Sequence, residues 1–82
     1  MSMITGLQIR AARSALRWSA DKLSKQSGIG LRTIKRLEQS DGVPNSHSST
    51  LIALKETLES AGIEFVGSPD EAPGIRLHRT ED

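Results

Sequence analysis

One stretch of the chain, from Ser19 to Glu38, constrains the fold more than any other. It reads SADKLSKQSGIGLRTIKRLE and is divided by glycines into two short segments of helical character. Gly28 follows Ser27 where a helix favours a left-handed residue after its last turn. Gly30 is a tolerable N-cap for the segment that follows. The stretch therefore predicts two helices that meet at a steep angle across a tight turn.

Apolar residues at helical spacing predict two further helices, one on each side of this pair. The four expected helices cover about residues 4–17, 20–27, 31–39 and 49–61. Thr5 is the expected N-cap of the first helix and Ser19 that of the second. Ser48 or Ser49 is expected to cap the fourth helix, and Gly62 to end it.

The tail of the chain changes from helical to strand-like periodicity. Residues 63–66 are apolar or alternating, residues 75–79 alternate strictly, and the segment between them is rich in turn formers. This pattern predicts a β-hairpin with a long loop over residues 67–74. An isolated hairpin is marginal in water, so it should pack on the helices or join a second copy edge to edge.

The expected fold class is mainly α, with a four-helix part that contains the helix-turn-helix pair over residues 1–62 and a strand tail over residues 63–82. Because a chain of 82 residues buries only a modest core, self-association would help it. The tail is the expected dimerisation element. Its candidate dimer contacts are the apolar strand residues Ile63, Phe65, Ile75 and Leu77.

Charge is distributed unevenly although the net charge is only +1. Between residues 10 and 36 there are five arginines and three lysines, against one acid, Asp21, whereas acidic residues predominate after Lys55. A basic front half and an acidic tail indicate a surface that faces an anionic partner. The alternative is a solvated helical face with no partner.

Several classes of protein are disfavoured. The chain has no cysteine, no apolar run of about 20 residues and no signal-peptide pattern at its start, so we expect a cytoplasmic protein without disulfides. His47 and His78 lie far apart, and no nucleophile–base set, phosphate loop or metal-ligand spacing is visible. We therefore expect no enzyme activity, no metal and no cofactor.

Seven residues share their spacing with a known family: Arg13, Ser19, Leu23, Gly28, Ile34, Leu37 and Glu38. Over roughly residues 7–61 the chain resembles the phage-repressor-like helix-turn-helix regulators (Cro/C1, or XRE-type). In that family the second helix of the pair enters the major groove, and dimers bind two half-sites. The resemblance implies a homodimeric, sequence-specific regulator of transcription, a repressor acting on an inverted-repeat operator in double-stranded DNA.

The chain departs from the family pattern in two places. Gly30 stands where the family usually has Ser or Thr, and the strand-forming tail replaces the usual fifth helix. The tail is similar to that of small Cro-type members that pair strands across a dimer. The resemblance also implies that Arg13 and Glu38 pair between the first and third helices and fix the recognition helix to the scaffold.

The third helix carries the expected base contacts, which are Leu31, Arg32, Thr33 and Arg36. Arg32 and Arg36 lie four residues apart on the face opposite Ile34, and arginine can bond guanine bidentately. Leu31 is expected to touch a thymine methyl or to pack against the second helix. Thr33 is expected to contact DNA or to bond its own helix.

The expected phosphate contacts are Ser19, Ala20, Lys35, Asn45, Ser46 and His47. Lys35 is a point charge suited to phosphate, and the start of the second helix offers backbone N–H groups to an anion. For residues 45–47, plain turn chemistry is the alternative. Trp18 and Leu23 have the spacing of a hydrophobic staple, so Trp18 is expected to anchor the helix junction; a stacking role is the alternative.

A second function stays open on the sequence alone. Antitoxins of toxin–antitoxin pairs often have this DNA-binding fold and neutralise a toxin with a tail. The hairpin around residues 63–79 would then bind the toxin or another protein partner while the helices regulate the operon. The sequence does not distinguish repressor from activator, nor does it reveal the operator or an effector.

Overall fold

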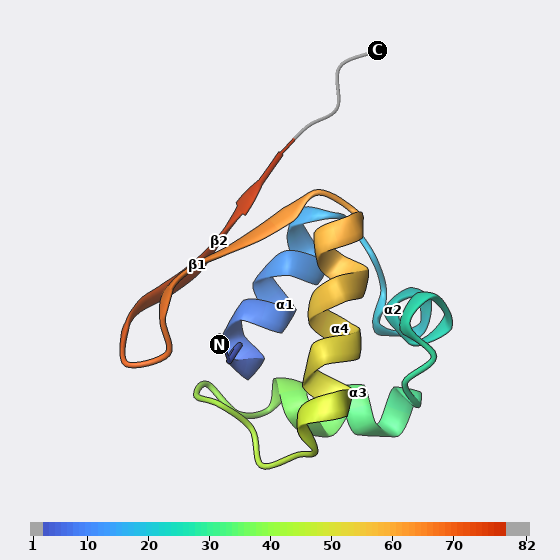
Figure 1. The fold of residues 1–82 in the computed structure, drawn as a ribbon. Coiled ribbons are helices and arrows are strands. Elements are labelled where there is room, and N and C mark those ends of the chain that lie inside the picture. Colours follow the sequence, from blue (N-terminus) through green and yellow to red (C-terminus); the bar gives the residue numbers. More distant parts are fainter. Residues whose placement is uncertain (1–2, 79–82) are drawn as a thin grey trace.

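The computed structural model describes residues 3–78, which form four helices and a two-stranded antiparallel hairpin (Figure 1). The elements are α1 (Gly6–Ala15), α2 (Ala20–Ser27), α3 (Leu31–Glu38), α4 (Ser48–Ser60), β1 (Ile63–Ser68) and β2 (Glu71–Leu77). The expected combination of four helices and a hairpin is thus confirmed. Residue 79 of the predicted second strand lies outside the described residues. None of the helices within residues 3–78 has a stretch both long and apolar enough to cross a bilayer.

Helix α1 begins at its predicted cap but ends earlier than expected. Thr5 and Gln8 form a capping box, in which Gln8 N donates to Thr5 Oγ1 (3.0 Å) and Thr5 N donates to Gln8 Oε1 (2.9 Å). The helix ends at Ala15 because Arg17 has a left-handed backbone (φ 59°). This turn lets Trp18 N bond Arg13 O (2.9 Å) and redirects the chain into α2.

The boundaries of α2 and α3 follow the local signals in the sequence. Ser19 caps α2 by accepting the N–H of Lys22 (3.0 Å), and Gly28 ends it with φ 79°. Gly30 is the N-cap of α3 and has no side chain with which to bond the first turn. These predictions are confirmed, although α3 ends at Glu38, one residue before the expected Gln39.

Helix α4 begins one residue earlier than the sequence predicted. Its N-cap is His47, whose extended backbone (φ −65°, ψ 141°) places its carbonyl to accept from Leu51 N (3.3 Å). The His47 side chain makes no capping bond, and Ser48 is already helical. The prediction that Ser48 or Ser49 caps the helix is therefore wrong: the backbone path out of the preceding loop, and not a serine hydroxyl, determines where α4 starts.

The hairpin has longer strands and a shorter turn than predicted. The register pairs Ile63 with Leu77 and Phe65 with Ile75, and it shifts after Val66. Gly67 lies at this shift with a left-handed backbone (φ 75°). The position requires glycine because a Cβ there would overlap the carbonyl oxygen of Ala72. The expected loop over residues 67–74 is wrong because most of this segment lies in the two strands on either side of a tight turn.

One apolar core joins the helices to the hairpin. Its members are at most 3% exposed and are Ile4, Ile9, Ala12, Leu23, Ile34, Leu37, Leu51, Leu54, Leu58 and Ile63. Phe65, Ile75 and Leu77 pack against this core from the hairpin, whose second strand lies along α1. The hairpin meets the requirement that it pack on the helices within the same chain.

Helix α1 approaches the end of α3 at Gly6. Gly6 N donates to Gly42 O (3.0 Å), and a Cβ on Gly6 would overlap the carbonyl oxygens of Leu37 and Ser40. The first turn of α1 therefore rests directly on the last turn of α3 and on the backbone that follows it. Only a glycine allows this contact without displacing one of the two segments.

We expect Gly6→Ala to destabilise the protein by about 1–3 kcal/mol, the usual cost of forcing an extra methyl group into a packed site. Chemical denaturation followed by circular dichroism measures the change. Gly42→Ala is the matched control, because a Cβ there would meet no atom within 4 Å. Equal stability of the two variants would contradict the close approach described here.

The solvent face of the hairpin carries a small charged cluster. Glu64 Oε1 lies 2.6 Å from His78 Nε2 and 3.3 Å from Arg76 Nη1. The hydrogen bond with His78 lowers the pKa of Glu64 below the ordinary value of a glutamate, and the charge of Arg76 lowers it further. Because this pKa is depressed on folding, the cluster stabilises the hairpin above the ordinary glutamate pKa. The stabilisation is lost as the pH falls through the folded pKa.

His78→Ala is expected to raise the pKa of Glu64 toward the ordinary glutamate value, because it removes the main cause of the shift. An NMR titration of the Glu64 side-chain carboxyl carbon measures this pKa directly. Arg76→Ala should raise it by less. A pKa of Glu64 that is the same with and without His78 would refute the assignment.

Candidate nucleic-acid interface

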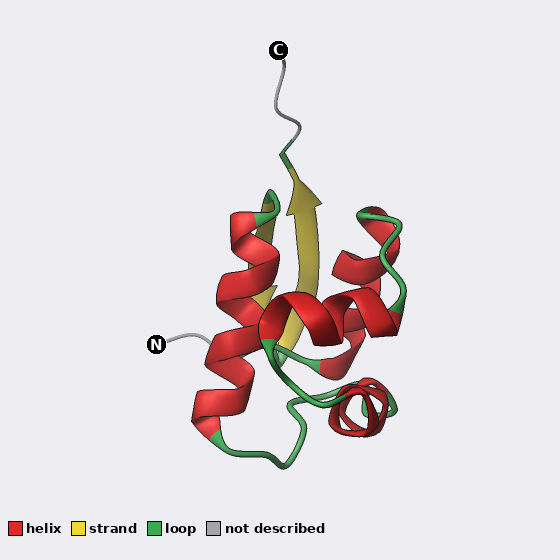
Figure 2. Ribbon diagram, turned by 90° about the vertical axis from the view of Figure 1, so that its right-hand side faces the viewer, coloured by secondary structure: helices red, strands yellow, loops and turns green. Residues whose placement is uncertain are grey.

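Helices α2 and α3 cross at a steep angle over the turn at residues 28–30. In Figure 1, α3 lies across the lower end of the molecule and α2 is seen close to end-on. In Figure 2, turned by 90°, α2 lies across the view and α3 is end-on. Two side-chain bonds hold the turn: Ser24 Oγ donates to Ile29 O (2.6 Å), and Ile29 N donates to Ser27 Oγ (3.1 Å).

Helix α3 has two chemically different faces. Ile34 and Leu37 are fully buried and attach the helix to the core, whereas Arg32, Lys35 and Arg36 are exposed. We call these three exposed residues the basic face. The structure therefore brings together three of the residues that the sequence predicted for DNA contact.

The basic face also differs from other cations of the molecule in its partners. Within residues 3–78, no acidic side chain forms an ion pair with it. Five cations elsewhere do have carboxylate partners, namely Arg10, Arg13, Lys25, Lys55 and Arg76. Arg17 and Lys22 resemble the basic face, because they too form no ion pair within residues 3–78. The positive charge on α3 is thus not compensated by a neighbouring acid in this part of the chain, and it is available to an external anion.

Arg36 makes a contact that the sequence did not predict. Its Nη1 donates to the carbonyl oxygen of Asn45 (3.2 Å), which links α3 to the loop before α4. The bond is exposed and joins a charged donor to a neutral acceptor. Arg36 therefore braces this loop in the free protein, while the Arg32 and Lys35 side chains extend from the same helix.

The other predicted contacts are placed less uniformly. Leu31 and Thr33 are half-buried on α3, so neither side chain is fully presented to a ligand. The following predicted phosphate contacts are exposed or half-buried: Ser19, Ala20, Asn45, Ser46 and His47.

The start of α2 already has internal partners. The hydroxyl of Ser19 accepts from Lys22 N, and Asp21 places a carboxylate beside the first backbone N–H groups of the helix. Asp21 in turn pairs with Lys25 (3.3 Å). This negative charge weakens the attraction of the α2 N-terminus for a phosphate.

Arg13 joins three parts of the scaffold behind the basic face. Its Nε and Nη2 donate to the two carboxylate oxygens of Glu38 (2.9 Å each), and its Nη1 donates to Trp18 O (3.0 Å). Glu38 is only 7% exposed. The hydrogen bonds to Glu38 raise the pKa of Arg13, against the opposing effect of burial. The paired contact fixes the end of α3 to α1.

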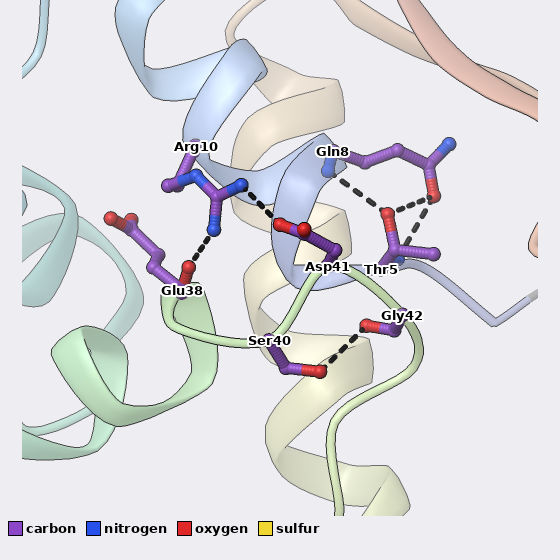
Figure 3. Close-up of polar contacts among 7 residues, drawn as sticks. All are labelled: Thr5, Gln8, Arg10, Glu38, Ser40, Asp41 and Gly42. Carbon is purple, nitrogen blue, oxygen red and sulfur yellow. Dashed lines mark hydrogen bonds and ion pairs between the residues drawn. The ribbon is translucent and has the colours of Figure 1, made fainter.

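Arg10 reinforces the same end of α3, and sequence reasoning missed this role (Figure 3). Its Nη1 donates to the carbonyl oxygen of Glu38, and its Nη2 pairs with Asp41 Oδ1 (2.7 Å). A cation at the C-terminus of a helix bonds carbonyls that have no intrahelical partner. Arg10 lies 28 residues away along the chain, so no local signal could have revealed the contact.

Trp18 is half-buried and packs against the core at the junction of α1 and α2. Lys22 Nζ lies 5.6 Å from the centre of its ring, within the range of a cation–π contact. The position is that of an anchor between helices, with a lysine over part of the ring.

The predicted dimer contacts face the helices of their own chain. Ile63 is 3% exposed in the core, and Phe65, Ile75 and Leu77 are half-buried against it. Within residues 3–78 the two strands pair only with each other, so the outer backbone groups of the hairpin have no strand partner.

Comparisons with known proteins add no assignment to this geometry. The chain matches no protein-family model, and it has no significant match among the curated proteins. Among residues 3–78, no three metal-binding side chains lie close enough together to hold an ion. The function of the chain is therefore inferred from the residues of α3 and from the elements that position them.

Proposed function

We propose that this protein is a sequence-specific, double-stranded DNA-binding regulator whose helix α3 enters the major groove. The observation that carries the proposal is the two-faced character of α3, which is buried through Ile34 and Leu37 and whose basic face has no acidic partner among the described residues 3–78. The steep crossing of α2 and α3 supports it, because the second helix of such a pair can project into the groove.

The three residues of the basic face have two different proposed roles. Arg32 and Arg36 lie one helical turn apart and have the planar fork that matches guanine O6 and N7, so they are the proposed base readers. Lys35 is a point charge and is the proposed phosphate contact. Arg36 exchanges its bond to Asn45 O for a DNA acceptor, and this exchange costs little because the existing bond is exposed.

The hairpin is the proposed dimerisation element. Strand β1 has no proline, whereas Pro73 in β2 lacks a backbone N–H and follows Ala72, which has a positive φ (49°). The edge of β1 is therefore better suited to pair with a second copy. Two copies related by a two-fold axis would bind an inverted repeat with half-sites roughly 34 Å apart, one turn of DNA. Repression would follow from occlusion of a promoter.

Selection of binding sites from a random duplex library tests the proposal. We expect the purified protein to enrich an inverted repeat that contains guanines in each half-site. Enrichment of single half-sites would retain DNA reading but refute the dimer. Recovery of no motif would refute sequence-specific binding and would favour a protein partner for the hairpin.

A further inference from the structure

Gln8 is a buried amide, 3% exposed, whose polar atoms all have partners. Its Oε1 accepts from the backbone N–H of Thr5 (2.9 Å) and lies 3.2 Å from Thr5 Oγ1. Its Nε2 donates to Val66 O (3.2 Å) and Gly74 O (2.8 Å) on the hairpin. One side chain thus caps α1 and bonds both strands, which satisfies its two N–H donors and its carbonyl acceptor.

The two hairpin acceptors are opposite each other on the ladder. Val66 pairs with Gly74 at the last regular step before the register shifts toward the turn. At the other end of the hairpin, Ile63 is buried in the core and His78 N bonds Gly62 O (2.7 Å). The hairpin is therefore held at both ends, and Gln8 provides the polar contact near its turn.

The first turn of α1 contacts α3 as well as the hairpin. Gly6 rests on the last turn of α3 and on the backbone that follows it. Arg10 bonds the last carbonyl of that helix and Asp41, as Figure 3 shows. Gln8 lies between these two residues in the sequence. A continuous series of short contacts thus runs from the hairpin through Gln8 and α1 to the end of α3.

We propose that Gln8 is a positioning residue that fixes the angle between the hairpin and α3. This inference rests on the proposed function, in which the hairpin joins two copies and α3 reads DNA. In such a dimer the angle determines how far apart, and in which relative rotation, the two copies of α3 lie. Gln8 thereby determines which spacing of half-sites the dimer accepts.

Gln8→Glu separates this role from helix capping. Glutamate serves as well as glutamine at this position of a capping box, so its carboxylate can still accept from Thr5. It has no N–H to donate, and its negative charge would face the carbonyl oxygens of Val66 and Gly74. Thr5→Ala is the matched control, because it removes the side-chain cap and keeps the Nε2 donors of Gln8.

The experiment measures affinity for the selected inverted repeat and for versions with one base pair inserted or removed between the half-sites. When the spacing between the half-sites is changed, we expect the affinity of the wild type and of Thr5→Ala to fall at least about tenfold, equivalent to about 1.4 kcal/mol. For Gln8→Glu we expect the loss to shrink to less than about threefold, about 0.7 kcal/mol.

An unchanged spacing preference in Gln8→Glu, with an inverted repeat recovered for the wild type, would overturn the role of Gln8 and leave the proposed function standing. If the wild type recovers only single half-sites, the role of Gln8 fails with the dimer while DNA reading stands; if it recovers no motif, the proposed function fails as well. If Gln8→Glu does not fold, as judged by circular dichroism, Gln8→Met replaces it: it has a similar size, no charge and no donor. A wild-type spacing preference in that variant would likewise overturn the role.

Discussion

Replacing Arg32 and Arg36 together with alanine is expected to weaken binding to the selected operator by about 30- to 20 000-fold. Each bidentate arginine–guanine contact is worth about 1–3 kcal/mol of discrimination, and every 1.4 kcal/mol corresponds to about tenfold in affinity. Both side chains are exposed on α3, opposite the buried Ile34 and Leu37. Their removal should therefore leave the core and the stability of the protein nearly unchanged.

Fluorescence anisotropy with the operator and with a scrambled duplex distinguishes the loss of base recognition from the loss of electrostatic attraction to phosphate. Arg32→Ala should reduce the preference for the operator over the scrambled duplex. Lys35→Ala should weaken binding to both duplexes alike and should lower the slope of log affinity against log salt concentration by about 1. Lys55→Ala removes the same charge from α4, where Lys55 pairs with Glu59, and is the control. A double variant of Arg32 and Arg36 that binds as tightly and selectively as the wild type would show that recognition lies elsewhere.

Glu38→Ala is expected to lower the free energy of unfolding by about 3 kcal/mol, near the lower end of the range for breaking a buried ion pair. The lower end applies because the Arg13 side chain is 25% exposed and keeps its bond to Trp18 O. Without the carboxylate, Arg13 remains ionised in a partly buried site, and the end of α3 loses one of its attachments to α1. For a domain of this size the melting temperature should fall by more than about 10 °C.

Thermal and chemical denaturation measure this loss. Asp41→Ala is the matched control, because it breaks the neighbouring pair with Arg10 at a side chain that is 82% exposed. Exposed pairs contribute about 0–1 kcal/mol, so its effect should be several times smaller. An unchanged melting temperature in Glu38→Ala would remove Arg13 and Glu38 from the structural role assigned to them.

The features that the sequence predicted well are those decided by neighbouring residues. The Ser19 cap and the left-handed Gly28 depend on interactions within a few positions of the chain, and both are present. The burial of Ile34 and Leu37 follows from helical periodicity alone, which also places Arg32 and Lys35 outward. The face of α3 was therefore predictable once the helix was recognised.

The features that the sequence did not predict depend on the paths of loops and turns or on residues far apart in the chain. The start of α4 at His47 follows the path of the preceding loop, and the hairpin turn depends on how Gly67 passes Ala72. The bonds from Arg10 to Glu38 O and from Gln8 to the hairpin connect separate elements. The sequence shows a polar residue on a helix in both cases, and only the packed fold reveals its partner.

The exposure of Leu31 and Thr33 in the candidate site was also not predictable from the sequence. Both lie on α3, and the sequence left open whether they contact DNA or pack within the protein. The structure finds them half-buried. In the proposed complex, their share in recognition would depend on how deeply α3 enters the groove.

The measurement that tests the central claim most directly is an NMR titration of the ¹⁵N-labelled protein with the duplex enriched in the library selection. We predict that the largest amide shifts fall in α3, between Gly30 and Arg36, and in the loop around Asn45, because Arg36 links that loop to α3. Shifts confined to the hairpin or to α4, with α3 unaffected, would contradict DNA reading by the basic face.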